Sequence, residues 1–188
     1  MAFLDLTLTL DQSVFIYKEL NYSDPPFLTE EWSKFEDRSY QVSKLCMGTQ
    51  TGTHLAAPAH FSPKGATIDQ IKLENLCGSY CFADLNKEIS DVKPSDSSIL
   101  FIQNEKSSWK SNQFEKLLSW ECKLWVIQDF ADKDPFPMHK ALADKGIFLA
   151  ENLNPEKSAK IDGSGALYVV PLKLQKLSGS PCRIFLQY

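Results

Sequence analysis

The sequence lacks the charge pattern of proteins that bind nucleic acid or membrane surfaces. Its 24 acidic residues outnumber its 20 basic ones, which gives a formal net charge of -4, and no stripe of Lys and Arg occurs along it. Nucleic acid and anionic lipid are bound through concentrated positive charge. We therefore expect no nucleic acid and no membrane among its partners.

A disulfide framework and a secretory signal are also missing. Five cysteines are present, an odd number without framework spacing or a CxxC pair. The N-terminus shows no charged segment followed by a long apolar run. Reduced thiols and a cytoplasmic location are the simplest interpretation.

No internal repeat, low-complexity tract or linker divides the chain. Its 188 residues are enough to bury one core without disulfides or a structural metal. The composition, 43% hydrophobic and 23% charged, is ordinary for a globular protein. We expect a single domain over residues 1–188.

The order of predicted elements indicates an α/β fold with a mixed sheet. Residues 3–10 alternate at period two, as in a strand, and residues 15–40, broken by Pro25-Pro26, predict an irregular covering segment. The central segments "SSILFIQ" and "CKLWVIQDF" are typical of strands buried on both faces, with a helical pattern between them. A helix, Gly146 and an apolar strand follow, and the last segment predicts two strands joined at "SGSP".

Histidine is the scarcest residue with useful chemistry, and all three copies fall in two segments. His54 and His60 lie in "MGTQTGTHLAAPAHF", where Gly52 suits an extended chain with a bend. His139 begins the predicted helix and Glu151 ends the next strand. The helix runs about 12 Å out and the strand about 15 Å back, so both ends reach one level.

These four side chains are expected to line one pocket. Two imidazoles and a carboxylate, with a fourth position open to water, form a catalytic zinc set. The ordinary alternative is that each histidine only satisfies buried backbone groups.

Several segments resemble those of the cyclase family, which contains bacterial kynurenine formamidase and isatin hydrolase. "TQTGTHLAAPAHF" is similar to its H-T-G-T-H-x-D-x-P-x-H-F signature, and "FLDLTLTL" resembles its N-terminal strand. "MHKALADKGIFLAENLN" and "VVPLKLQKLSGSPCRIF" resemble its later helix–strand segment and its C-terminal hairpin. These motifs span nearly the whole chain in the family order.

The resemblance implies a swivelling β/β/α-type fold with a mixed, partly barrel-like sheet, usually dimeric. It also implies hydrolysis of an amide or lactam with zinc or manganese. His54 matches a metal ligand, His139 and Glu151 match the later pair, and His60 matches the histidine given a proton-transfer role. Two ligand positions differ, because Gln50 replaces a histidine and Ala56 replaces the aspartate.

Three interpretations follow from these departures. The first is a hydrolase with a rebuilt single-metal centre at His54, His139 and Glu151, in which water attacks a carbonyl and His60 shuttles the proton. The second is a metal-free relative that binds a small aromatic or acidic ligand, with Gln50 as a hydrogen-bond contact. The third is a structural or partner-binding protein with a vestigial pocket.

Overall fold

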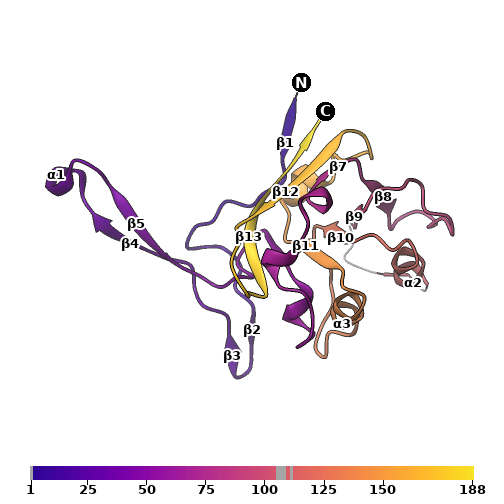
Figure 1. Cartoon of the computed structure of the whole chain (residues 1–188), viewed down its shortest axis with the longest axis horizontal. Helices are drawn as coiled ribbons and strands as arrows, with labels where there is room; N and C mark the ends of the chain where they lie inside the picture. The colour runs from indigo at the N-terminus through magenta and orange to yellow at the C-terminus, as the bar shows by residue number, and fades with distance from the viewer. Residues whose placement is uncertain (1, 105–108, 111) are drawn as a thin grey trace.

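A computed structural model of the chain describes residues 2–104, 109–110 and 112–188. Within this part, nine strands form one mixed sheet that curls into a half-barrel (Figure 1). The predicted α/β class with a partly barrel-like sheet is confirmed. The strands are β1 (Phe3–Asp5), β6 (His54–Ala56), β7 (Cys77–Gly78), β8 (Cys81–Asp84), β9 (Ile99–Gln103), β10 (Leu124–Ile127), β11 (Phe148–Glu151), β12 (Ala166–Pro171) and β13 (Gly179–Gln187).

The sheet combines a parallel and an antiparallel half. Its order is β7-β12-β13-β6-β11-β10-β9-β8, and β1 pairs with the end of β13. Strands β8 to β11 run parallel, as strand–helix–strand units require, whereas β6, β12 and β13 pair antiparallel. The junction between the halves is the β6–β11 pair, which carries two of the expected site residues.

Short helices connect the strands. The segment "GATIDQIKLENLCGSY" combines helix-like apolar spacing with polar turn residues, and it forms two single 3-10 turns, η2 and η3, in place of a longer helix. No helix among the described residues is long and apolar enough to cross a membrane. The helical elements are α1 (Phe35–Arg38), η1 (Pro58–His60), η2 (Ile68–Gln70), η3 (Leu73–Asn75), α2 (Gln113–Leu118), α3 (Pro137–Asp144) and α4 (Pro155–Ser158).

The central strands are buried on both faces, as the density of apolar residues predicts. On β9, Phe101 packs into the cluster inside the curl, and its neighbours Leu100 and Ile102 pack into a second cluster on the other face. Leu117 of α2 and Leu142 of α3 belong to that second cluster, so both helices cover the outer face. A rigid centre of this kind can hold side chains in place at its strand ends.

Two predicted strand boundaries are wrong. The N-terminal strand ends at Asp5 rather than near residue 10, because Thr7 and Leu8 bond to Ile184 and Thr53 outside a regular ladder. The turn of the C-terminal hairpin lies at residues 172–178, and β13 already includes Gly179 to Pro181 of the "SGSP" segment.

Residues 15–46 are more regular than the prolines suggest. They form two hairpins, one of β2 (Lys18–Glu19) and β3 (Tyr22–Ser23) and one of β4 (Leu28–Ser33) and β5 (Val42–Cys46). Pro25-Pro26 fall between the hairpins, so each remains free to pair locally. The second hairpin, with α1 at its tip, projects from the body as a long arm (Figure 1).

Candidate functional site

A tight turn delivers His54 to the junction of the two half-sheets. Gly52 has φ +62, and a Cβ there would lie 2.5 Å from Leu10 Cδ2, so glycine is needed at the bend. Beyond the bend, the Thr53 hydroxyl donates to the Asn152 carbonyl, 2.6 Å away, and ties the turn to the end of β11. His54 follows as the first residue of β6 and is 3% exposed.

The tautomer of His54 follows from its backbone partner. Its Nδ1 lies 2.9 Å from the Gly52 carbonyl oxygen, which can only accept, so Nδ1 carries the proton. Nε2 is therefore the ring nitrogen that faces Glu151, whose Oε1 is 3.4 Å away. Antiparallel pairing of Glu151 with His54 places the two side chains next to each other.

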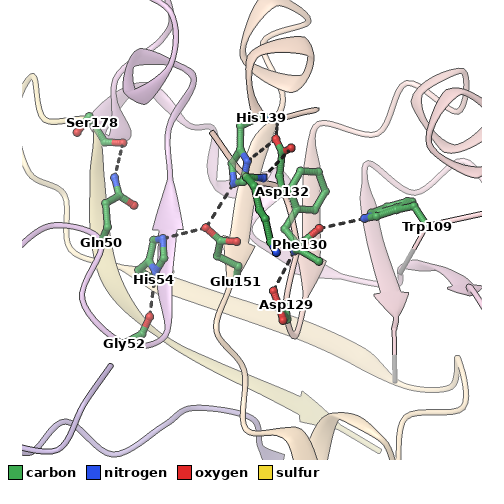
Figure 2. Close-up of polar contacts among 12 residues, drawn as sticks. Gln50, Gly52, His54, Trp109, Asp129, Phe130, Asp132, His139, Glu151 and Ser178 are labelled. Carbon is green, nitrogen blue, oxygen red and sulfur yellow. Dashed lines mark hydrogen bonds and ion pairs between the residues drawn. The ribbon is translucent and has the colours of Figure 1, made fainter. Parts of the chain in front are cut away.

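His139 reaches the same carboxylate from helix α3. Its Nε2 lies 3.7 Å from Glu151 Oε1, and Glu151 lies between the two imidazoles (Figure 2). Asp132 Oδ2 accepts both from His139 Nδ1 and from the His139 backbone N–H, each at 2.9 Å. Asp132 thus fixes the ring orientation as well as the start of the helix. Sequence reasoning missed Asp132, although a carboxylate just beyond a buried parallel strand is a usable signal.

The charges of this cluster are coupled. Burial favours the neutral form of Glu151, but contacts with His139 and His54 outweigh it and hold the pKa of Glu151 far below its usual range. Burial likewise opposes protonation of His139, yet Glu151 and Asp132 together raise the pKa of that imidazole. The favoured state is a carboxylate beside a ring that gains a proton more readily than a free histidine.

His60 lies at the outer part of the same cavity. It is the last residue of η1 and is exposed. Its ring packs edge-on against Phe61, with the two ring centroids 4.5 Å apart. Phe61 in turn packs on His139 at 4.7 Å. Partial burial, followed by the nearby His54 and His139, lowers the pKa of His60. A neutral imidazole at the wall can accept a proton near neutral pH.

Gln50 and Ala56 occupy the two altered positions. The Gln50 amide nitrogen bonds to the Ser178 carbonyl at 3.4 Å, which ties the turn to the C-terminal hairpin (Figure 2). A Cβ at residue 179 would lie 2.6 Å from that nitrogen, so Gly179 makes room for it. Gln50 Oε1 is buried and has no protein partner in the described part of the chain. Ala56 is buried on β6 and carries no donor atom.

His54, His139 and Glu151 are residue types that bind a single divalent metal, but their side chains are not arranged around a common metal position. Each imidazole donates a hydrogen bond from Nδ1 to an oxygen, as metal-binding histidines do, so that Nε2 is the nitrogen that would face a metal. Two ligands of one tetrahedral zinc lie roughly 3.3–3.4 Å apart, close to the His54–Glu151 distance of 3.4 Å. However, the described residues contain no group of three or more His, Cys, Asp or Glu side chains that is placed to hold a metal ion. In this arrangement the Glu151 carboxylate lies between the two rings, with Oε1 at 3.4 Å from His54 Nε2 and 3.7 Å from His139 Nε2.

A cavity of about 830 Å³ opens over this cluster. His54, His60, His139, Glu151 and Gln50 all line it, so the structure brings the five sequence-predicted site residues to one cavity. Six aromatic side chains also line it, and sequence reasoning had not separated these rings from ordinary core. They are Phe15, Tyr17, Tyr22, Phe61, Phe130 and Phe136.

The fold and the cavity define a class: an α/β protein with a curled mixed sheet and a histidine–carboxylate pocket at the junction of its halves. The family profile described as "Putative cyclase" matches residues 4–121. Because this match covers more than half of the sequence, the chain belongs to the cyclase family.

Curated relatives and solved structures agree with this assignment. The chain is 29% identical over 184 residues to a kynurenine formamidase of Bacillus cereus, covering 85% of this chain and 87% of that protein. Isatin hydrolase A from Labrenzia aggregata, bound to benzyl benzoate, has the same fold, with a TM-score of 0.77, 19% identity and coverage of 98% and 92%. A predicted metal-dependent hydrolase from Bacillus stearothermophilus superposes with a TM-score of 0.70, 21% identity and coverage of 98% and 97%.

Proposed function

We propose that this protein is a hydrolase that cleaves the C–N bond of a small amide or lactam, of the formamide or isatin type. The observation that carries the proposal is the Glu151 carboxylate, buried between His54 and His139 at an aromatic cavity. Family membership supports it, as does the name kynurenine formamidase among the relatives. We also propose that residues 1–188 act as one cyclase-like domain.

His54, His139 and Glu151 would hold a single zinc or manganese ion. When bound, such a metal supplies a Lewis acid for a carbonyl and a water of lowered pKa. Asp132 and the Gly52 carbonyl orient the two rings for this task. A second metal has no support, since Ala56 stands where a bridging aspartate is needed.

His60 would move the proton. Water adds to the carbonyl carbon, the C–N bond breaks, and the products are a carboxylic acid and an amine. The neutral His60 ring accepts the proton from water and returns it to the leaving nitrogen. Its exposed edge and lowered pKa suit both steps. The aromatic wall would hold the substrate ring and exclude bulk water.

A metal-free, ligand-binding member of the family is the second candidate function. It is favoured by the altered positions, because the Gln50 amide is engaged with Ser178 and Ala56 offers no donor. It is also favoured by the way in which Glu151 fills the space between the imidazoles. In this case Gln50 Oε1, buried without a partner among the described residues, would be a hydrogen-bond point for the ligand.

Metal analysis separates the two candidates. For the hydrolase, protein exposed to zinc or manganese should retain about one ion per chain by mass spectrometry of the metal. Glu151→Gln should lower the metal affinity by tenfold or more, so that the ion is released, and the control His60→Gln should retain the ion. N-formylkynurenine and isatin are then tested as substrates, and activity should be lost in both variants.

A degenerate site gives the opposite pattern. The unmodified protein would then retain no metal and hydrolyse neither substrate, and the double variant Gln50→His with Ala56→Asp would gain both properties. Turnover by chelator-treated protein at the untreated rate would contradict the metal-dependent mechanism.

We further propose a homodimer assembled through the arm of β4, α1 and β5. Its apolar side chains find little cover in the chain itself, as Trp32 is 67% and Phe35 66% exposed. Light scattering should give twice the chain mass of 21.3 kDa, and Trp32→Ser with Phe35→Ser should shift it to the monomer. A monomer mass for the unmodified protein at high concentration would contradict the dimer.

A further inference from the structure

The aromatic cavity carries an unusual surplus of acid. Five carboxylates line it, and Lys133 is the only Lys or Arg among its described lining residues. Protonation of His139 would offset one of these charges, and the cavity would stay negative. The carboxylates belong to Glu19, Asp24, Asp129, Asp132 and Glu151.

These acids occupy two levels. Asp132 and Glu151 lie deep and are engaged with His139 and His54. Glu19 and Asp24 lie on and just after the β2–β3 hairpin, in the exposed segment over the cavity. The upper pair has no role in the proposed hydrolysis.

Tyrosines hold the upper pair in place without neutralising it. The Tyr17 hydroxyl donates to Glu19, and the Tyr22 hydroxyl donates to Asp24 at 2.6 Å. Both tyrosines line the cavity, so each carboxylate stands beside an aromatic ring. A hydroxyl is a neutral donor, and the full negative charge remains available to a ligand.

The charges of these acids act on neighbouring side chains of the cavity. At Tyr17 the hydrogen bond to Glu19 is the main cause that raises the pKa to about 12, and the charges of Glu19, Asp134 and Asp24 add to it. Asp24 also acts on His60, where its charge opposes the lowering of the pKa. The β2–β3 segment and the part of the cavity that contains Asp132 and Glu151 therefore form one negatively charged region.

The rings themselves add to the preference for a cation. Tyr17 packs on Phe136 at 6.0 Å, and Phe136 packs on Phe61 at 5.5 Å, which forms a continuous aromatic wall. The faces of such rings attract ammonium groups. Carboxylates beside aromatic rings recognise an ammonium by charge and by ring face together, and they repel a carboxylate.

We propose that, among aromatic amides, the cavity binds those that carry a protonated amine more tightly than neutral ones, and neutral ones more tightly than those whose only charge is a carboxylate. The ammonium group would lie near Glu19, Asp24 and the tyrosine rings, and the amide would lie over the cluster of His54, Glu151 and His139. This rests on the proposed function for the amide part only. The cation preference is a property of binding and needs no turnover.

Calorimetric titration with three matched probes tests the preference. 2-Phenylethylammonium, neutral 2-phenylethanol and anionic 3-phenylpropionate share one ring and differ in charge. At low salt the cation should bind about tenfold tighter than the neutral probe, the anion should bind weakest, and high salt should narrow the gap. Equal or tighter binding of the anion overturns the proposal.

A variant pair assigns the effect to the named residues. Glu19→Gln with Asp24→Asn keeps the acceptor oxygens for both tyrosines and should lower cation affinity about tenfold, with neutral-probe affinity unchanged. The control Glu74→Gln with Asp144→Asn removes the same charge from exposed positions outside the cavity lining and should preserve cation selectivity. An equal loss in both variants overturns the proposal.

The same titrations keep this inference separate from the hydrolase proposal. They are run on chelator-treated and metal-loaded protein beside assays of amide cleavage. Selective cation binding without any amide cleavage would leave this inference standing and refute the hydrolase. Amide cleavage without a charge preference among the probes would refute this inference alone.

Discussion

The centre of the sheet and the arm of β4, α1 and β5 both contain large apolar side chains, and the two regions treat them in opposite ways. Phe101 on β9 has no exposed surface, whereas Phe35 at the tip of the arm is 66% exposed. The centre is covered on both faces by packed clusters, and within the described chain β4 and β5 pair only with each other. The comparison teaches that the apolar content of a segment does not by itself show whether its side chains are buried or exposed.

The largest expected effect is the difference in stability between two variants that each replace a phenylalanine with alanine, one in the centre of the sheet and one in the arm. Phe101→Ala should lower the free energy of unfolding by about 3–5 kcal/mol, because it leaves a cavity in a packed core. Phe35→Ala removes an exposed ring and should change it by no more than about 0.5 kcal/mol in the monomer. Urea denaturation at low protein concentration measures both. Similar losses in the two variants would mean that the arm belongs to the folded core.

A second pair sharpens the comparison within the cavity, where His139 is largely buried and His60 is exposed. His139→Ala removes a partner from the buried Glu151 and Asp132 and should cost on the order of 3 kcal/mol. His60→Ala should change stability by about 0.5 kcal/mol or less, since its ring lies at the outer part of the cavity and packs mainly on Phe61. Denaturation in the presence of a chelator checks both. A larger loss of stability for His60→Ala than for His139→Ala would contradict this prediction, because it would make His60 the more important of the two for stability.

The smallest effect is expected at the rim of the sheet, where Arg183 of β13 pairs with Asp5 of β1 at 2.6 Å. Burial favours the neutral acid, but contacts from Arg183 and Thr7 outweigh it and lower the pKa of Asp5. A lowered pKa adds stability above the unfolded pKa of about 3.9, and that stability disappears as the pH falls through the folded value.

Arg183→Gln should therefore destabilise the fold only slightly at neutral pH, since the guanidinium is largely exposed. The difference from the unmodified protein should shrink when the pH is lowered toward about 3, below the unfolded pKa of the carboxyl. Urea midpoints at the two pH values measure it. A difference that grows in acid would show that the pair does not depress the pKa of Asp5.

Much of the fold could be predicted from local pattern. The strands around Phe101 and Trp125 have continuous apolar runs, and only a strand covered on both faces accommodates them. The return of the chain from His139 to Glu151 followed from helix and strand rise alone, and their side-chain atoms do meet at 3.7 Å. Boundaries were less accurate, because Thr7 and Leu8 leave the ladder for bonds to residues distant in sequence.

Sequence alone determined which donor atoms are available at the candidate site and which are absent, since side-chain identity sets the donor atoms. His54, His139 and Glu151 can ligate, and Ala56 cannot. Tertiary structure decided what these residues do with one another: the carboxylate stands between two rings, Asp132 orients His139, and the Gln50 amide bonds to Ser178. It also decided that Glu19 and Asp24 face the same cavity as residues more than a hundred positions away. Such contacts depend on packing between distant segments, and no local pattern in the chain encodes them.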